Sequence, residues 1–544
     1  MLALKVLIPL QAAAVLGMCS VWLLSLNKRD YSRPPKHHQD GEEGDLLTSC
    51  LSEFGVPYVT SHDSNHTIWA ESTTPYNSRL AYMPRAVVVP QSVRHIQDAV
   101  TCAGTLSVRV TAKSGGHSFA SSGLGGEDGH LVVDLSLMEK VTLQKDNVTA
   151  IIQPGARLGH VALQLYEQGK RAISHGSCPG VGIGGHVLHG GFGFSSRSRG
   201  LTLDYLRAAT VVLANSSVVR CSETENPDLF WALRGAGSAF GIVTELEFDT
   251  FAPPSSVVAF TVDAPFRDAD TIAACLAKLQ EMALSAPKEL DMLFFAGPLG
   301  VYLTGTFDGS QEALGEVLAP VLNVTKTAIT DIETVDWIKS LQDFTFGPEL
   351  DQKSLHYHAH ANFYVSSAMT PALEEKQIRR LSKLMQKNLK SVSRTETWNM
   401  FLELHGGGNS AVFNAGPHQG SFPHRDKLLL WQFAYHLTGI NEDQEQQKKK
   451  KKQDFPTAKA TKLVKKLRDT VTSDIPDGQW GMYANYPDSE LKPEAAQKLY
   501  YGRSLPRLQR IKAALDPKAM FYSPGGVIFE RDKNGDAKMM ESHE

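Results

Sequence analysis

The residues best able to do chemistry in this sequence lie in two glycine-rich segments. The first, Lys113–Gly123 (KSGGHSFASSG), contains His117, and the second, Ser174–Gly193 (SHGSCPGVGIGGHVLHGGFG), contains Cys178. Eight of the eighteen residues 176–193 are glycine. Glycine at this density allows positive φ and close backbone approach, and amides free of side-chain bulk can cradle a pyrophosphate. The pattern favours a cofactor site that presents an imidazole and a thiol over a pair of flexible loops.

Other chemistries fit these residues less well. His175, Cys178, His186 and His189 could form a zinc set, but their spacing matches no zinc finger or zincin, and no metal is expected. A Cys–His nucleophile pair lacks any surrounding hydrolase signature. The glycines of Gly235–Gly241 have the wrong spacing for a Rossmann fingerprint, and the sequence contains no P-loop motif.

The two segments resemble the FAD-binding domain of vanillyl-alcohol-oxidase-type flavoproteins. The second segment is similar to the bicovalent branch of that family, which includes berberine-bridge enzymes and oligosaccharide oxidases. The similarity extends from about Cys50 to Val527 and is greatest to fungal glucooligosaccharide oxidases. It is carried further by Asn226–Val243, Trp480–Tyr486 and Tyr500–Pro517.

This resemblance implies a covalent FAD, with His117 bonded to the flavin 8α-methyl group and Cys178 to ring carbon 6. An imidazole or thiolate held against the electrophilic flavin edge can form such bonds. The resemblance assigns further cofactor contacts to Gly115, Gly116, Ser118, Gly182, Gly184, Gly185, His186, Gly190, Gly193 and Val243. It also implies a disulfide between Cys50 and Cys102, which leaves Cys221 and Cys275 as core thiols or a second bridge.

The same resemblance identifies Tyr486 as the catalytic tyrosine and Glu403 as its partner carboxylate. Oxidation of an alcohol needs a base for the hydroxyl proton while hydride leaves carbon for the flavin. A phenol has an ordinary pKa of about 10, so a carboxylate helps by accepting its hydrogen bond. Without the resemblance, Tyr486 would be interpreted as a packed sheet tyrosine and Glu403 as a solvated strand end.

The substrate side of the site departs from the family pattern. Oligosaccharide oxidases have aspartate, and the plant berberine-bridge branch glutamate, where this chain has Glu403. Phe119 replaces a tyrosine of the glucose-oligomer oxidases, so a stacking face remains and a hydroxyl is lost. We expect Phe119 and Gln432 to contact substrate and Val181 to control oxygen access. Ser523–Gly526 lacks the glutamine usual after its proline.

These features predict an enzyme that oxidises the reducing-end C1 hydroxyl of an oligosaccharide to a lactone. Electrons would pass through FAD to oxygen, giving hydrogen peroxide. An alternative is an FAD-linked oxidase or oxidative cyclase of an alcohol or secondary metabolite. A second alternative, a non-catalytic flavin-binding protein, is disfavoured because it would not need Glu403 and Tyr486 beside His117 and Cys178.

The segments around these motifs predict an α+β fold. We expect a vanillyl-alcohol-oxidase-type FAD-binding domain and a substrate domain whose antiparallel sheet is covered by helices. Before Asp249–Ser255 (DTFAPPS), whose paired prolines mark a domain boundary, strands are predicted at Ala86–Val89, Ser107–Ala112, His130–Leu135 and Val148–Gln153, with helices at Ser92–Cys102 and Leu158–Glu167. After it, strands are predicted at Val257–Val262 and within Met292–Phe307, and a helix at Pro371–Leu389.

The expected organisation has six parts. They are a signal peptide or signal anchor (1–29), a linker (30–45), the FAD-binding domain (46–252), the substrate domain (253–478), a C-terminal segment that returns to the FAD-binding domain (479–530), and a polar tail (531–544).

The amino terminus predicts export through the secretory pathway. Val6–Leu26 contains 21 uncharged residues, which fits either a cleaved signal or a membrane anchor. Glycosylation sequons begin at Asn65, Asn147, Asn215 and Asn323. We therefore expect the enzyme domain to be secreted, or anchored on the lumenal or extracellular side.

Overall composition excludes several classes of protein. The 544 residues carry a net charge of −3, with 42% hydrophobic and 21% charged residues, as in ordinary globular proteins. A chain with a net charge close to zero lacks the strong positive electrostatic potential that attracts a nucleic-acid backbone, so no nucleic-acid partner is expected. The run Lys448–Lys452 is interpreted as a solvated surface loop.

Overall fold

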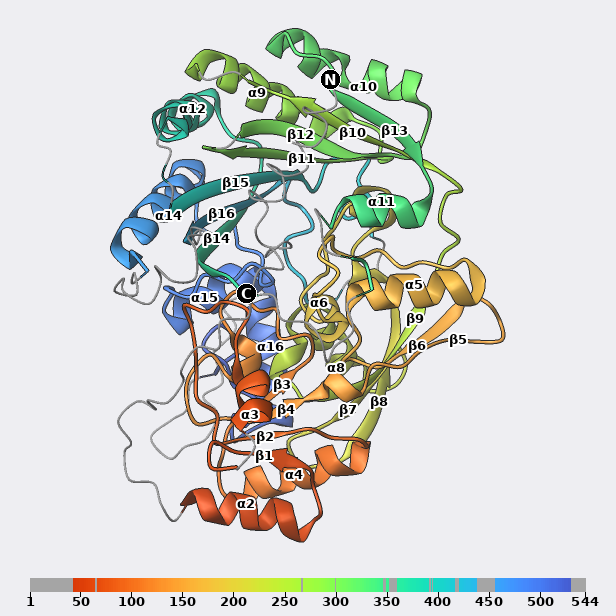
Figure 1. Ribbon diagram of the computed structural model, residues 1–544, viewed down its shortest axis with the longest axis vertical. Helices are drawn as coiled ribbons and strands as arrows, with labels where there is room; N and C mark the ends of the chain where they lie inside the picture. The colour runs from red at the N-terminus through yellow and green to blue at the C-terminus, as the bar shows by residue number, and fades with distance from the viewer. Residues whose placement is uncertain are drawn as a thin grey trace, which may run out of the picture.

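The computed structural model describes residues 43–63, 66–265, 268–298, 300–345, 349–351, 360–390, 393, 395–415, 420–437 and 455–529. Within them the chain forms an α+β protein with two domains, as the sequence predicts (Figure 1). Asn65, Lys448–Lys452, the amino-terminal apolar stretch and the predicted polar tail lie outside the described residues.

The first domain contains two sheets. A four-stranded sheet has the order β1-β2-β4-β3, and β4 pairs in parallel with both β2 and β3. A five-stranded antiparallel sheet has the order β5-β6-β9-β7-β8. The strands are β1 (Tyr58–Val59), β2 (Ala86–Val88), β3 (Val110–Lys113), β4 (Leu131–Asp134), β5 (Val141–Leu143), β6 (Thr149–Ile152), β7 (Leu206–Val212), β8 (Val218–Ser222) and β9 (Ile242–Asp249). The helices are α2 (Glu43–Glu53), α3 (His66–Thr73), α4 (Val93–Thr105), α5 (Leu158–Gly169), α6 (Ile183–Val187), α7 (Ser196–Arg199) and α8 (Pro227–Ala236).

The elements around α4 show where the local predictions succeed and where they fail. The Ser92 hydroxyl accepts a hydrogen bond from the His95 amide, so the helix begins where the cap was expected. The predicted strand from Ser107 begins only at Val110, because Ser107 adopts a left-handed φ of 55°. Helix α2 begins at Glu43, within the expected linker of residues 30–45.

Helix α2 is fixed to α4 by apolar packing and a covalent bond. Leu47 and Leu51 are buried in the same core as residues of α4. The structure confirms the disulfide between Cys50 and Cys102, which joins the two helices. Cys221 and Cys275 are buried free thiols, so the described residues contain no second bridge between them.

The second domain is a seven-stranded antiparallel sheet of order β13-β10-β12-β11-β15-β16-β14. Its strands are β10 (Val257–Asp263), β11 (Leu290–Gly297), β12 (Gly300–Phe307), β13 (Asp331–Val335), β14 (Asn362–Thr370), β15 (Glu396–Leu404) and β16 (Leu429–Leu437). Helices α9 (Ala269–Ser285), α10 (Gln311–Thr325), α12 (Glu375–Leu389) and α14 (Thr457–Thr472) cover its outer face, and α11 (Trp337–Asp343) lies toward the first domain (Figure 1). The chain enters this domain between Asp249 and Val257, where the paired prolines were expected to mark the boundary.

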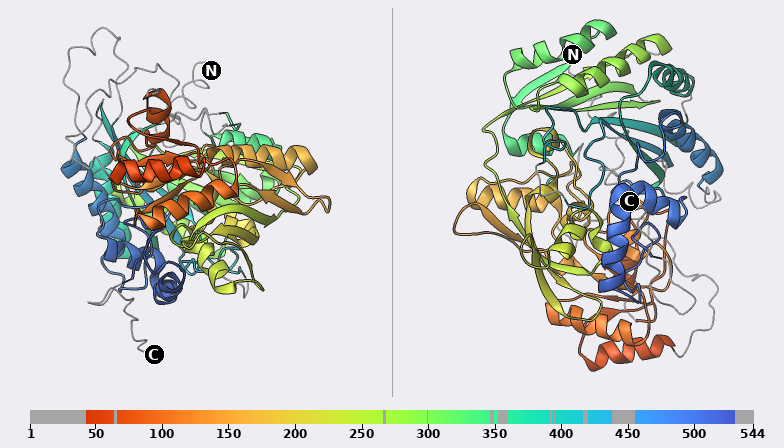
Figure 2. Two further views of the ribbon diagram at one scale, coloured as in Figure 1. Left: turned by 90° about the horizontal axis from the view of Figure 1, so that it is seen from below. Right: turned by 180° about the vertical axis from the view of Figure 1, so that it is seen from behind.

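After α14 the chain returns to the first domain. Helices α15 (Pro493–Tyr501) and α16 (Leu505–Leu515), blue in both views of Figure 2, pack there, with α16 against α8. A buried ion pair between Lys512 and Asp516 secures α16, and Lys512 also donates to the carbonyls of Ala239 and Phe521. The crossing segment, residues 480–490, passes between the domains and presents Tyr486 there.

Among the described residues, no helix has both the length and the apolar character needed to cross a membrane. The sequon asparagines Asn147, Asn215 and Asn323 are all exposed.

Candidate active site

The two glycine-rich segments lie against one another. A Cβ on Gly115 would come 2.4 Å from the Gly182 nitrogen, and one on Gly182 would come 2.1 Å from the Gly115 nitrogen. No side chain fits such a contact, so glycine is required on both sides. The buried guanidinium of Arg157 donates to the carbonyls of Gly115 and Gly180 and fastens the two loops together.

His117 is two residues from Gly115 and Cys178 four residues from Gly182, so both lie within a few residues of this contact. The His117 ring stacks on Tyr76 with centroids 3.7 Å apart. Burial, assisted by the charge of Arg157, lowers the pKa of His117 to about 3. The imidazole is therefore neutral near pH 7, which leaves a nitrogen lone pair able to attack an electrophilic carbon.

The residues present fit a flavin. The junction offers a neutral imidazole, and Gly185 is exposed with nothing within 4 Å of an added Cβ. The Cys178 sulfur is held in a disulfide in this structure, so its bond to a flavin stays a prediction. Glu403 Oε2 is shielded from solvent and has no hydrogen-bond partner among the residues that the structure describes. A bound group with a donor could satisfy this oxygen.

Glu403 and Tyr486, 83 residues apart in sequence, meet between the two domains. Their side chains form a hydrogen bond that raises the pKa of Tyr486 and opposes the rise at Glu403. Loss of water around the carboxyl raises the pKa of Glu403 to about 8, and burial raises the pKa of Tyr486 well above its ordinary value. Near pH 7 the carboxyl of Glu403 is therefore mostly protonated, and the pair can accept a proton only as the pH rises toward 8.

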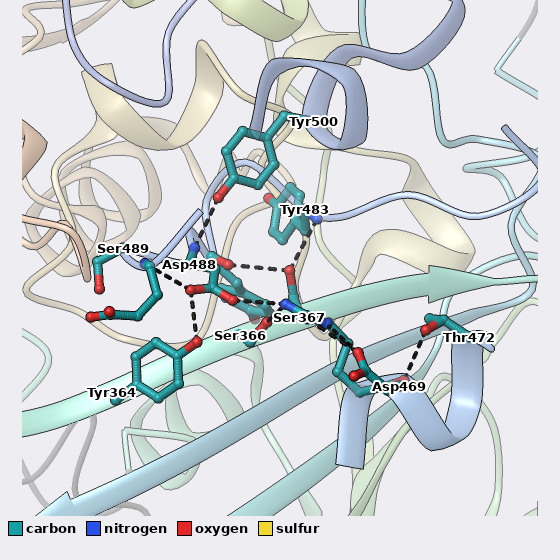
Figure 3. A network of polar contacts seen from close by, with 12 residues as sticks. Tyr364, Ser366, Ser367, Asp469, Thr472, Tyr483, Asp488, Ser489 and Tyr500 are labelled. Atoms are coloured by element: carbon teal, nitrogen blue, oxygen red, sulfur yellow. Dashed lines mark hydrogen bonds and ion pairs between the residues drawn. The ribbon is translucent and has the colours of Figure 1, made fainter. Parts of the chain in front are cut away.

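The segment that carries Tyr486 is held by buried polar contacts (Figure 3). The Ser367 hydroxyl donates to the Tyr486 carbonyl at 3.1 Å and accepts from the Tyr483 amide at 3.2 Å. Asp488 accepts from Tyr364 at 2.8 Å and from Arg468 at 2.9 Å. These contacts attach the crossing segment to β14 and α14 and so fix the backbone that carries Tyr486.

Tyr483 connects the same segment to the second glycine loop. Its hydroxyl accepts hydrogen bonds from the amides of Gly191 and Phe192 at 2.9 and 3.0 Å, and from Asn485 at 3.0 Å. Asn485 also donates to the His186 carbonyl. The crossing segment and the expected cofactor loop are thus one hydrogen-bonded unit.

The sheet face above this unit is mainly aromatic. Phe119 stacks against Tyr486, with ring centroids 5.8 Å apart and planes 18° apart. Gln432 is buried on β16 directly opposite Phe401, on the face that also carries Glu403. The structure therefore brings Phe119 and Gln432 to the site. Other buried side chains of the same cluster are Tyr76, Leu293, Phe295, Phe363, Phe401, Val365 and Ala434.

The other predicted cofactor residues differ in where they lie: some are in the glycine-rich loops and others are in the core of the first domain. Ser118 lies in the first loop, but its hydroxyl accepts from the amides of Ala120 and Ser122. The His186 ring accepts from the Gly176 amide, which holds the second loop in shape. Val181 is partly buried three residues after Cys178, and Val243 is buried in the first domain core on β9.

The expected glycines serve backbone geometry in the same region. Gly116 and Gly190 adopt positive φ values of 67° and 122°. A Cβ on Gly193 would meet the His175 carbonyl at 2.0 Å, and one on Gly184 would lie 3.0 Å from the Pro154 carbonyl.

Sequence reasoning missed four residues that shape the site. Tyr76 supports the His117 ring, and the Asn77 amide donates to the Phe119 carbonyl at 2.7 Å. Arg157 joins the loops, and Arg197 joins the domains through backbone carbonyls. An isolated arginine gives no local sequence signal for such contacts, because its partners are backbone atoms far along the chain.

Comparison with known proteins assigns the chain to a family. Residues 84–222 match the family described as FAD binding domain, and residues 482–528 match that described as Berberine and berberine like. An FAD-linked oxidoreductase of Metarhizium anisopliae, dpmaF, is 42% identical, covering 90% of this chain and 92% of the relative. Xylooligosaccharide oxidase of Thermothelomyces thermophilus is 40% identical, covering 88% and 94%.

A solved structure is similar as well. Glucooligosaccharide oxidase of Acremonium strictum, with a 6-S-cysteinyl, 8α-N1-histidyl FAD, aligns with a TM-score of 0.83 at 37% identity, covering 89% of this chain and 99% of that one. The chain therefore belongs to the FAD-linked, berberine-bridge-enzyme-like oxidoreductases, close to the fungal oligosaccharide oxidases, and is an enzyme that acts on CH–OH groups.

Proposed function

We propose that this enzyme oxidises the reducing-end C1 hydroxyl of an oligosaccharide to a lactone and passes the electrons to oxygen. The observation that carries the proposal is the contact between Glu403 and Tyr486, whose ring stacks on Phe119 of the His117 loop. Relatives that act on oligosaccharides at about 40% identity support the substrate class.

In the proposed reaction Tyr486 accepts the C1 hydroxyl proton while its own proton moves to Glu403. The O–H and C1–H bonds break, C1 gains a double bond to oxygen, and the hydrogen leaves C1 with its electron pair. FAD supplies the acceptor for that pair when bound, and His117 and Cys178 are the residues that would hold it covalently. Molecular oxygen then takes two electrons and two protons and leaves as hydrogen peroxide, with Val181 beside its path.

Two orienting tasks fall to the sheet face. Phe119 offers a flat apolar surface against which a pyranose ring can stack. Gln432 offers both a donor and an acceptor for sugar hydroxyls. Because Glu403 Oε2 is shielded from solvent, water competes little for the proton on Glu403.

The test is anaerobic reduction of the flavin. Purified holoenzyme is titrated with cello-, malto-, xylo- and chito-oligosaccharides while its visible absorbance is recorded, and air is then admitted. Bleaching by one series with rapid recovery in air supports the proposal and identifies the sugar. Slow recovery indicates a dehydrogenase, and no bleaching by any series contradicts the oligosaccharide substrate.

A second candidate is oxidation or oxidative cyclisation of an apolar alcohol or secondary metabolite. The observation that favours it is the aromatic lining of the sheet face, in which Phe119, Phe363 and Phe401 lie near Tyr486. The 42% identical relative carries the broader name FAD-linked oxidoreductase. The same anaerobic titration with hydrophobic primary and benzylic alcohols separates the two candidates.

We propose further that the protein enters the secretory pathway. The exposed sequon asparagines at 147, 215 and 323 and the Cys50–Cys102 disulfide support this location. Expression in a fungal host, followed by glycosidase treatment of medium and membrane fractions, tests it. A mass decrease in one fraction supports export and separates secreted from anchored protein, whereas unglycosylated protein confined to the cytosol contradicts it.

A further inference from the structure

A buried arginine of the first domain reaches into the second domain beside the catalytic carboxylate. Arg197, on α7, is completely buried. Its guanidinium donates to the carbonyl of Leu290 at 3.0 Å and to that of Gly406 at 2.6 Å. Its amide donates to Asp291 Oδ1 at 3.0 Å. A buried cation is tolerated only when it is paired and hydrogen-bonded, and Asp291 supplies the opposing charge.

The sheet register places Asp291 next to Glu403. Leu293 on β11 lies directly opposite Glu403 on β15. Asp291 is two residues before Leu293 and shares its face, so it is a diagonal neighbour of Glu403. Diagonal neighbours in an antiparallel pair are roughly 7–8 Å apart. Asp291 is 4% exposed, so water screens this separation poorly.

We propose that Asp291, held by Arg197, is a positioning residue that sets the pH at which the Glu403–Tyr486 pair can accept the substrate proton. This inference rests on the proposed function. When Asp291 is ionised, its negative charge at this distance disfavours a second negative charge on Glu403, so the pair accepts a proton only at higher pH. Asp291 acts through the electric field and through the Arg197 contact, without touching the reacting atoms.

The other titratable groups around Glu403 do not supply the negative charge that acts on it. Tyr483 and Tyr486 are phenols whose pKa values are raised by burial, so both stay neutral. His405 lies two residues further along the chain, just beyond the end of β15, and burial lowers its pKa to about 3. Burial raises the pKa of Asp291 to about 7 against the opposing effect of Arg197, so Asp291 is ionised where Glu403, with a pKa of about 8, begins to ionise.

The test is the pH profile of anaerobic flavin reduction in wild type and Asp291→Asn. The variant removes the charge of Asp291. We expect the acid limb of its profile, where the reduction rate falls as the pH is lowered, to move about one pH unit lower. Asp291→Glu should keep the limb near its original position. The matched control is Asp516→Asn, which breaks an equally buried pair with Lys512 far from Glu403. It should lower the thermal midpoint and leave the acid limb in place.

The outcomes separate this proposal from a structural role. An unchanged acid limb in folded Asp291→Asn overturns it, even if stability falls. Asp291→Ser, whose hydroxyl can still accept the Arg197 amide, replaces Asp291→Asn if that variant does not fold. The wild-type profile tests the proposal without any variant: an acid limb at about pH 4–5, where glutamate ordinarily ionises, overturns it. If oligosaccharides do not reduce wild type, the proposed function fails instead, and the profile is measured with the alcohol that does.

Discussion

Gly115 and Gly182 touch through their backbones, and this contact joins the loop of His117 to the loop of Cys178. A Cβ on Gly182 would overlap the Gly115 nitrogen and lie 2.2 Å from the Ser114 hydroxyl oxygen. Because backbone atoms form most of the contact, the loops could relieve the clash only by separating. The geometry that would present two nucleophiles to one flavin thus depends on the absence of two side chains.

Gly182→Ala should therefore lower flavin content more than it lowers stability. We expect loss of most of the absorbance near 450 nm per mole of purified protein, because the loops no longer hold His117 and Cys178 together. Gly315→Ala is the control, since nothing lies within 4 Å of an added Cβ there. Full flavin loading in Gly182→Ala would show that the loops can rearrange freely.

Tyr486→Phe should abolish most of the chemistry and leave the cofactor in place. The variant keeps the ring that stacks on Phe119 and removes the hydroxyl that takes the proton. General-base catalysis contributes about 10²–10⁴-fold, so we expect a loss of that size in the anaerobic rate of flavin reduction. Stopped-flow absorbance checks it, with unchanged flavin content as the control for folding. A loss below tenfold would assign the base to another residue.

Local sequence features predicted helix starts and the domain boundary well, because interactions between neighbouring residues determine both. The Ser92 cap and the paired prolines before Val257 act within a few residues of their positions. The start of β3 was misplaced because the hydropathy pattern does not reveal the left-handed backbone conformation of Ser107.

The site could be predicted only in part, for a related reason. Glycine density located the loops, and the family resemblance paired Glu403 with Tyr486. Spacing alone could not, because the pair forms only when β15 and the crossing segment meet between the domains. Arg197 and Asp291 were missed because their roles come from burial and sheet register, which residue type does not show.

Glu403→Gln should change how stability depends on pH. The folded state raises the pKa of Glu403 to about 8, against an ordinary value of 4.5. An acid with a raised folded pKa favours folding while it is protonated, and this contribution is lost as pH rises from about 4.5 through 8. Glutamine stays neutral, so the variant should gain thermal midpoint over wild type progressively from pH 5 to pH 8. Thermal unfolding followed by tryptophan fluorescence measures it, and a difference that shrinks with rising pH would contradict the raised pKa.

The two proposed flavin links can be tested by removing them separately and together. Wild-type protein precipitated with acid should keep its yellow colour in the pellet, because covalent FAD cannot be washed away. His117→Ala and Cys178→Ala should each keep the colour through the remaining bond, and the double variant should release FAD into the supernatant. Cys221→Ser is the matched control: burial raises the pKa of the Cys221 thiol to about 12, which keeps it unreactive, so its replacement should leave the colour in the pellet. Release of FAD from either single variant would show that the chain forms one link and not two.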